Sequence, residues 1–149
     1  MEDLIRKIDG VVATTVGYTG GHLENPTYKH VRTGSTGHFE AIEIEFNPGI
    51  VSYETILKHF FKLHDPTQAD GQGNDHGPQY MSAIFFHDAS QKEVAQNLMT
   101  KIAPYFEHDL ATKLIEASEF YPAEEYHQDY LEKNPNGYTC HYYRSVDFW

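Results

Sequence analysis

The residue with the clearest chemical potential in this sequence is Glu40, because it interrupts the apolar face of a predicted strand. Residues 39–46 alternate between apolar and charged side chains, with Ile42 and Ile44 on one face. Glu40 falls on the same face, so its carboxyl group is expected to point inward. A carboxyl group removed from water keeps its proton to higher pH and can then act as a general acid toward a basic oxygen. The alternative is a structural carboxylate, bound to an arginine or to a backbone amide.

Two tyrosines and an aspartate lie in loops rich in glycine and proline on either side of this strand. Tyr28 ends the segment Asn-Pro-Thr-Tyr, and Tyr80 follows a loop that contains Asp75. A tyrosine hydroxyl can donate a hydrogen bond to a polarised oxygen. Taken singly, each tyrosine also fits a packing role, and Asp75 fits a turn. These three residues and Glu40 are therefore candidates for one site.

Nucleophilic and metal-binding residues give weaker signals. The chain has one cysteine, Cys140, which cannot form an internal disulfide. Its ten histidines include no i, i+4 pair on a predicted helix, and there is no Cys-x-x-Cys motif. The segment Asn74-Asp75-His76 is the only plausible ligand cluster. We expect neither a metal nor another cofactor.

The hydrophobic pattern predicts interleaved strands and helices in one domain, residues 1–149. Strands are expected at residues 11–16, 39–46, 80–87 and 111–117, and helices at residues 1–8, 53–65, 90–102 and 122–131. Ser52 should cap the second helix, and Ser90 with Glu93 should form a capping box for the third. A glycine-rich loop is expected at 17–37, and an irregular tail from about 138 to 149.

This order of elements predicts an α+β fold. We expect a two-layer sandwich with a ferredoxin-like core, in which a small mixed β-sheet carries helices mainly on one face.

The composition is that of a globular protein, with 40% hydrophobic and 22% charged residues. No apolar run approaches the roughly 18 residues of a membrane-spanning helix. The first residues are charged and include no apolar signal-peptide region, so we expect a cytoplasmic protein with no membrane partner. The formal net charge of −11, without a cluster of basic residues, argues against nucleic acid as a partner.

Several short motifs are far more specific together than any single residue. They occur in this order: Gly-Tyr-Thr-Gly-Gly at 17–21, Asn-Pro-Thr-Tyr at 25–28, Thr-Gly-His-Phe-Glu at 36–40, His-Asp-Pro-Thr-Gln at 64–68, Gln-Gly-Asn-Asp-His-Gly at 72–77, Gln-Tyr-Met-Ser-Ala-Ile at 79–84, Ala-Glu-Glu-Tyr-His-Gln at 123–128 and Asn-Pro-Asn-Gly-Tyr at 134–138. From Met1 to about Arg144, the chain closely resembles the A-type peptide methionine sulfoxide reductases.

The resemblance implies a protein-repair oxidoreductase that reduces the S epimer of methionine sulfoxide, free or in proteins, to methionine. In such enzymes a cysteine thiolate attacks the sulfoxide sulfur while an acid protonates the oxygen. Another thiol resolves the resulting sulfenic acid, and thioredoxin reduces the disulfide. By motif position, Glu40 resembles the proton donor, and Tyr28 and Tyr80 resemble the hydroxyls that hold the oxygen. Asp75 matches a loop acid of the site. Cys140 resembles a resolving cysteine, with a surface thiol of no role as the alternative.

The family's nucleophile belongs to a Gly-Cys-Phe-Trp segment at the start of its first helix, and residues 1–149 contain no such segment. We also expect the family's first strand to be missing. Three explanations stay open: a misassigned start, including a UGA selenocysteine codon read as a stop; a pseudoenzyme that binds oxidised methionine without reducing it; and a deliberate truncation. We expect residues 1–149 to show no reductase turnover. We also expect any unpaired sheet edge to be covered by another segment or by a second copy.

Overall fold

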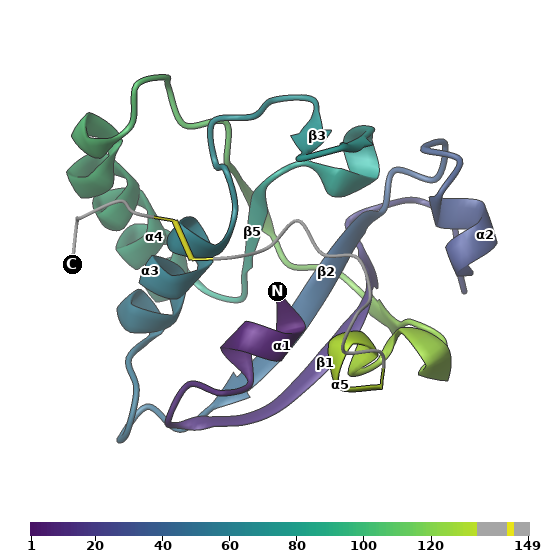
Figure 1. Cartoon of the computed structure of the whole chain (residues 1–149), viewed down its shortest axis with the longest axis horizontal. Coiled ribbons are helices and arrows are strands. Elements are labelled where there is room, and N and C mark those ends of the chain that lie inside the picture. The colour runs from purple at the N-terminus through teal and green to yellow at the C-terminus, as the bar shows by residue number, and fades with distance from the viewer. Residues whose placement is uncertain (134–142, 145–149) are drawn as a thin grey trace.

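The computed structural model describes residues 1–133 and 143–144, and it confirms the α+β class (Figure 1). The strands are β1 (Val11–Thr19), β2 (Phe39–Phe46), β3 (Gly71–Gln72), β4 (Asp75–His76), β5 (Ala83–Phe86), β6 (Lys113–Glu116) and β7 (Phe120–Pro122). The α-helices are α1 (Glu2–Ile5), α2 (Tyr28–Val31), α3 (Tyr53–Leu63), α4 (Ala89–Ile102) and α5 (Tyr130–Lys133). Short 3₁₀ helices are η1 (Pro78–Tyr80), η2 (Ala103–Tyr105) and η3 (Glu125–His127).

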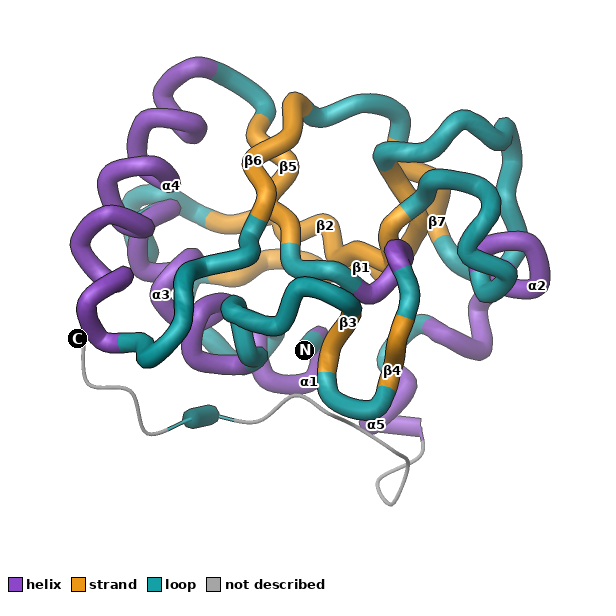
Figure 2. Tube along the Cα trace, turned by 90° about the horizontal axis from the view of Figure 1, so that it is seen from above, coloured by secondary structure: helices purple, strands orange, loops and turns teal. Residues whose placement is uncertain are grey.

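The strands form three small sheets, where the sequence predicted a single mixed sheet. β1 lies between β2 and β7 in an antiparallel sheet, β5 and β6 form a parallel pair, and β3 and β4 form a short antiparallel pair. Figure 2 shows the β5–β6 pair as a unit separate from β1, β2 and β7. Parallel and antiparallel pairing therefore both occur, but in different sheets, and a cavity lined by residues of both β2 and β5 lies between two of them.

The main core joins α3 and α4 to the β5–β6 pair. It contains Leu57 and Phe61 of α3, Ile84 of β5, and Leu98 and Ile102 of α4. The two helices lie side by side at one end of the molecule (Figures 1 and 2). Full burial of one such side chain stabilises the fold by about 1.5–3 kcal/mol. None of the helices in the described residues is long and apolar enough to cross a bilayer.

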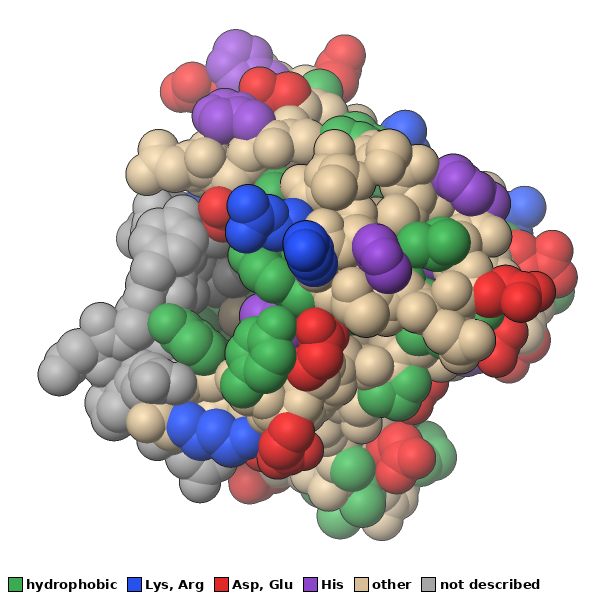
Figure 3. All heavy atoms as spheres, turned by 90° about the vertical axis from the view of Figure 1, so that its right-hand side faces the viewer, with side chains coloured by type: hydrophobic (Ala, Val, Ile, Leu, Met, Phe, Trp, Pro, Cys, Tyr) green, Lys and Arg blue, Asp and Glu red, His purple; other side chains and the backbone are tan. Residues whose placement is uncertain are grey.

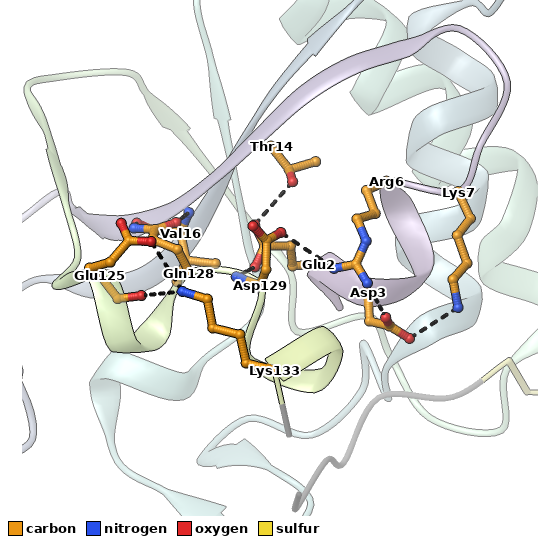
Figure 4. Close-up of polar contacts among 10 residues, drawn as sticks. All are labelled: Glu2, Asp3, Arg6, Lys7, Thr14, Val16, Glu125, Gln128, Asp129 and Lys133. Atoms are coloured by element: carbon orange, nitrogen blue, oxygen red, sulfur yellow. Dashed lines mark hydrogen bonds and ion pairs between the residues drawn. The ribbon is translucent and has the colours of Figure 1, made fainter. Parts of the chain in front are cut away.

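The short helix α1 is held in place by side-chain contacts shown in Figure 4. The buried Glu2 carboxylate accepts hydrogen bonds from the Thr14 hydroxyl at 3.0 Å and from the backbone N–H of Asp129 at 2.7 Å. Arg6 forms ion pairs with Asp3 and Asp129. A helix of four residues is unstable alone, so these contacts fix its position over β1.

The strand predicted at 11–16 continues to Thr19, through the start of the predicted glycine loop. Gly17 allows this because β7 crosses it closely: a Cβ atom on Gly17 would lie 2.4 Å from the Tyr121 carbonyl oxygen. The remainder of the predicted loop includes the unpredicted helix α2. The strand predicted at 80–87 is confined to Ala83–Phe86, and that at 111–117 to Lys113–Glu116.

Two helix predictions were wrong in detail. The capping box expected at Ser90 and Glu93 is not formed; Asp88 caps α4 instead, and its carboxylate accepts from the Gln91 N–H at 2.8 Å. The helix expected at 122–131 is replaced by the end of β7, by η3 and by α5, because Phe120–Pro122 pairs with β1. The predicted turn at 134–137 and all but residues 143–144 of the predicted tail lie outside the described residues.

Candidate active site

The four candidate residues that the structure describes lie on different elements but line one cavity of about 660 Å³. Tyr28 begins α2, Glu40 belongs to β2, Asp75 to β4 and Tyr80 to η1. The sequence analysis therefore grouped residues that the fold does bring together. Cys140, the fifth candidate, lies outside the described residues.

Glu40 carries a carboxyl group that keeps its proton near neutral pH. The cavity walls remove much of its hydration, and Asp75 adds nearby negative charge; together they raise the pKa of Glu40 from 4.5 to about 7. The cavity is wide, so the side chain is still reached by solvent. The acid can therefore meet a ligand and exchange its proton with water.

Tyr80 is held beside this acid. The pKa of Tyr80 is raised to about 12. Burial is the largest cause, and the charges of Glu40 and Tyr28 add to it. The Tyr80 hydroxyl is therefore protonated at neutral pH and can donate a hydrogen bond. The 3₁₀ turn positions it, since the Tyr80 N–H donates to the carbonyl of Gly77 at 3.1 Å.

Tyr28 is positioned by Glu124, a residue that the sequence analysis did not single out. One Glu124 oxygen accepts from the backbone N–H of Tyr28 at 3.1 Å, and the other accepts from the Tyr18 hydroxyl at 3.0 Å. Burial alone would raise the pKa of Glu124, but hydrogen bonds from the backbone and from Tyr18 and Tyr126 outweigh it and lower the pKa. Glu124 is thus an ionised anchor, and its only sequence signal was its place in the 123–128 motif.

His127 also lines the cavity and was missed by the sequence analysis. Its ring centroid lies 4.5 Å from that of Tyr28. Its Nε2 atom is buried and has no hydrogen-bond partner in the described part of the chain. Burial lowers the pKa of His127, so the ring is neutral at neutral pH and adds an uncharged polar atom to the cavity region.

His64 and Ser82, which also line the cavity, belong to a buried chain of polar groups. His64 Nδ1 lies 2.6 Å from the Phe60 carbonyl oxygen and donates to it, so Nε2 accepts from the Ser82 hydroxyl at 2.7 Å. Ser82 is also 2.7 Å from the Thr112 hydroxyl. Burial lowers the pKa of His64 to about 4. The neutral imidazole therefore ties the end of α3 to the residue just before β5.

The cavity is acidic, while the surface near α2 is mixed. The residues that line the cavity include Glu2, Asp3, Glu40, Glu43 and Asp75 and, within the described part of the chain, no lysine or arginine. The face at the α2 end carries acidic, basic, histidine and hydrophobic side chains close together (Figure 3). The cavity thus disfavours anionic ligands and suits a neutral ligand with a polarised oxygen.

In the segment Asn74-Asp75-His76, the only plausible ligand cluster in the sequence, the histidine contacts another residue. His76 Nδ1 lies 3.1 Å from a carboxylate oxygen of Asp70. Among residues 1–133 and 143–144, no group of three His, Cys, Asp or Glu side chains is arranged to hold a metal ion.

An acid of raised pKa in one cavity with two phenols belongs to the class of sites that can donate a proton and hydrogen bonds to a neutral ligand. Comparisons with known proteins show the family of the chain. The model of the family described as peptide methionine sulfoxide reductase matches residues 1–147. The peptide methionine sulfoxide reductase MsrA of Thermus thermophilus is 45% identical over 141 residues, which cover 95% of this chain and 80% of the relative.

Solved structures of Mxr1 are also similar to this chain over most of its length. Reduced Mxr1 from Saccharomyces cerevisiae superposes with a TM-score of 0.90 at 37% identity, covering 96% of this chain and 84% of Mxr1. Mxr1 in complex with Trx2 superposes with a TM-score of 0.60 at 25% identity, covering 96% of this chain and 80% of that chain. The chain belongs to the peptide methionine sulfoxide reductase family, of the MsrA type.

Proposed function

We infer that this site binds the methionine sulfoxide side chain, free or in a peptide, and serves the reduction of its S epimer to methionine. The observation that carries this proposal is the Glu40 carboxyl group, with its pKa of about 7, in one cavity with Tyr28 and Tyr80. A sulfoxide has no net charge but a strongly polarised S–O bond, which suits an acidic cavity with phenol donors.

In the proposed reaction, the hydroxyls of Tyr28 and Tyr80 donate hydrogen bonds to the sulfoxide oxygen, and Glu40 transfers its proton to that oxygen. A thiolate attacks the sulfoxide sulfur; the protonated oxygen then passes to the attacking sulfur, and the S–O bond of the substrate and the bond between the two sulfur atoms break. The sulfoxide is reduced to a thioether, and the thiol is oxidised to a sulfenic acid. The charge of Asp75 assists by keeping Glu40 protonated in the free site.

The reductant in this proposal is thioredoxin. A second thiol condenses with the sulfenic acid, releasing water and forming a disulfide that a dithiol then reduces. Cys140 is the proposed resolving thiol. The complex of Mxr1 with Trx2 supports thioredoxin as the partner. Residues 1–149 contain no Gly-Cys-Phe-Trp segment, so we propose that they bind the sulfoxide without turning it over.

Titration calorimetry with the separated epimers of N-acetylmethionine sulfoxide tests the binding site. The S epimer should bind at least about tenfold more tightly than the R epimer or methionine, because each lost hydrogen bond costs about 1 kcal/mol. The variant Glu40→Ala should remove the preference, while Glu43→Gln, on the same strand and also lining the cavity, should retain it. Equal binding of all three ligands would contradict the proposal.

A turnover assay with thioredoxin or dithiothreitol tests the second part. Residues 1–149 should produce no methionine from the S-sulfoxide. Measurable reduction that disappears in Cys140→Ser would overturn this and make Cys140 the nucleophile. Binding of the S epimer without turnover is the expected combination.

A further inference from the structure

The Gln79 side chain connects the two elements that carry the tyrosines of the cavity. Gln79 belongs to η1, directly before Tyr80, and is only 4% exposed. Its amide nitrogen donates to the carbonyl oxygen of Arg32 at 3.2 Å, across 47 positions of the chain. Arg32 caps the C-terminal end of α2, and its N–H donates to the Tyr28 carbonyl at 2.9 Å. A continuous path of contacts therefore joins Tyr28 to Tyr80.

The end of the Gln79 side chain is closely packed between two loops. A Cβ atom on Gly77 would lie 2.5 Å from Gln79 Oε1, and a Cβ atom on Gly34 would lie 3.4 Å from the same oxygen. Gly77 has a φ of 138°, which residues with a side chain rarely adopt. The glycines thus leave room for the amide between the segment after α2 and the segment before η1. Such close packing restricts the amide to few orientations.

A contribution to stability does not by itself account for this glutamine. Its Oε1 atom is buried and has no hydrogen-bond partner within the described part of the chain. A buried acceptor without a donor destabilises a fold, whereas a methionine would fill a similar space without that cost. Arg32 is an exposed residue, so water could satisfy its carbonyl oxygen in place of the amide. What the glutamine adds is a fixed connection between α2 and η1.

We propose that Gln79 is a positioning residue, which holds Tyr28 and Tyr80 at a fixed separation so that both hydroxyls reach one oxygen atom of a ligand. This inference rests on the proposed function for the ligand, a sulfoxide, but the connection between the two tyrosines exists without it. Glu124 anchors the start of α2, and Gln79 anchors its end. A helix of four residues is unstable alone, so the two anchors together define its orientation.

NMR of the tyrosine rings in the ligand-free protein tests the connection, with signals assigned from Tyr28→Phe and Tyr80→Phe. The variant Gln79→Met keeps the length of the side chain and removes its amide. It should shift the ring signals of Tyr28, which is distant from Gln79 in the chain. It should also leave the urea midpoint unchanged or raised, because the unpaired oxygen is removed as well. A shift confined to Tyr80, the chain neighbour of Gln79, would overturn the proposal.

The matched control is Gln72→Met. Gln72 is also 4% exposed and lies in the segment that leads to η1, but its amide forms hydrogen bonds of 2.9 and 3.0 Å with the backbone of Asp65. This substitution should lower the urea midpoint and leave the Tyr28 signals in place. Equal loss of stability and equal shifts at Tyr28 in the two variants would show that Gln79 has only a structural role, against the proposal.

Gln79→Glu is a second variant that keeps the shape of the side chain. At pH 9 its carboxylate cannot donate to the Arg32 carbonyl, whereas at pH 5 the protonated carboxyl group can. The Tyr28 signals should therefore differ from those of the wild type at pH 9 and return toward them at pH 5, with each comparison made at one pH. A difference that is the same at both pH values would contradict the role of the amide donor.

Calorimetry with the S epimer of N-acetylmethionine sulfoxide relates the connection to the proposed function. Gln79→Met should weaken binding by about fivefold, and by clearly less in a Tyr28→Phe background. Unchanged affinity would overturn the role of Gln79 and leave the sulfoxide site intact. If the wild type does not prefer the S epimer, the proposed function fails, and the Tyr28 signals decide whether Gln79 links the two tyrosines.

Discussion

The Glu124 carboxylate accepts a hydrogen bond from the backbone N–H of Tyr28, 96 positions earlier in the chain, at 3.1 Å. Its second oxygen accepts from the hydroxyl of Tyr18, which is almost completely buried. One acidic side chain thus connects the first residue of α2 to the middle sheet strand, β1. The position of the Tyr28 hydroxyl in the cavity depends on this connection.

Glu124→Ala should weaken binding of N-acetylmethionine S-sulfoxide by about tenfold, the effect of one misplaced hydrogen-bond donor. Glu125→Ala is the matched control, because the Glu125 side chain is 89% exposed and contacts Lys133. In a Tyr28→Phe background, Glu124→Ala should cause little further loss of affinity if Glu124 acts through Tyr28. Additive losses in the double variant would show that Glu124 affects binding independently of Tyr28.

Binding of the sulfoxide should depend on pH through Glu40. The protonated carboxyl group donates to the sulfoxide oxygen, and its pKa of about 7 means that half the protein carries the proton at neutral pH. Affinity should be constant in weakly acidic solution and fall by up to about tenfold per pH unit above 7. Glu40→Gln should give a flat profile, because an amide donates a hydrogen bond at every pH. A wild-type profile that is flat from pH 6 to 9 would contradict this assignment.

The same residue should make the fold slightly less stable in alkaline solution. The folded protein binds the Glu40 proton more tightly than the unfolded chain, so the stabilisation is complete below pH 4.5 and is lost as the pH rises through 7. Above pH 7, Glu40→Gln should exceed the wild type in unfolding free energy by about 1 kcal/mol, after allowance for solvent screening in the open cavity. Urea denaturation at pH 5 and pH 8 measures the difference, which should be much smaller at the lower pH.

The sequence predicted correctly the elements that are set by neighbouring residues, and it failed for an element that is set by residues distant in the chain. The strand at 39–46 was predicted residue for residue, because strict alternation of eight side chains is a local signal. The start of α3 was predicted from Ser52, whose hydroxyl accepts from the Thr55 N–H at 3.1 Å. Its end, predicted at residue 65, lies at Leu63. By contrast, the helix predicted at 122–131 failed because long-range pairing of β7 with β1 overrides local propensity.

The prediction of the candidate site also succeeded for local signals and failed for contacts between distant residues. Glu40 could be identified from the parity of its strand, and the motifs grouped it with Tyr28, Asp75 and Tyr80. The motif at 123–128 contained Glu124 and His127, yet nothing in its spacing showed which side chains meet Tyr28. Those contacts exist only after β7 brings the segment beside β1.

His64 should make the protein sensitive to acid. Burial lowers its pKa to about 4 in the folded state, whereas the unfolded chain titrates near the ordinary value of 6.5. Its contribution is therefore complete above pH 6.5 and is lost as the pH falls through 4, amounting to about 3 kcal/mol. The pH dependence of the unfolding free energy should be shallower in His64→Gln, whose side chain does not titrate. Identical slopes in the two proteins would exclude His64 as the cause.

Ser82→Ala should destabilise the fold by about 1–3 kcal/mol, because it leaves His64 Nε2 buried without a donor. Thr112 would lose its partner as well. Ser90→Ala is the matched control, since Ser90 is exposed in the first turn of α4, and it should change stability by less than about 0.5 kcal/mol. Denaturation at neutral pH compares the two variants. Equal stability would mean that the buried chain contributes no net stabilisation.

The Gln128 side chain forms hydrogen bonds with the backbone of β1 next to the point where β1 stops pairing with β7. Its amide oxygen accepts from the Val16 N–H at 2.9 Å, and its amide nitrogen donates to the Val16 carbonyl at 2.8 Å (Figure 4). The same nitrogen donates to the Ala123 carbonyl at 3.0 Å. One side chain therefore satisfies both backbone groups of Val16 and closes the turn that carries Glu124 toward Tyr28.

Gln128→Ala should lower the unfolding free energy by about 1–3 kcal/mol, because the Val16 N–H loses its acceptor in a partly buried position. Gln128→Glu should cost more at neutral pH, since a carboxylate would face two carbonyl oxygens without a proton to donate. Below pH 4 the Glu variant should recover relative to the Ala variant, as protonation restores one donor. The exposed Gln96→Ala serves as the control. A Glu variant as stable as the wild type at pH 7 would show that water, and not the Gln128 amide, satisfies Val16.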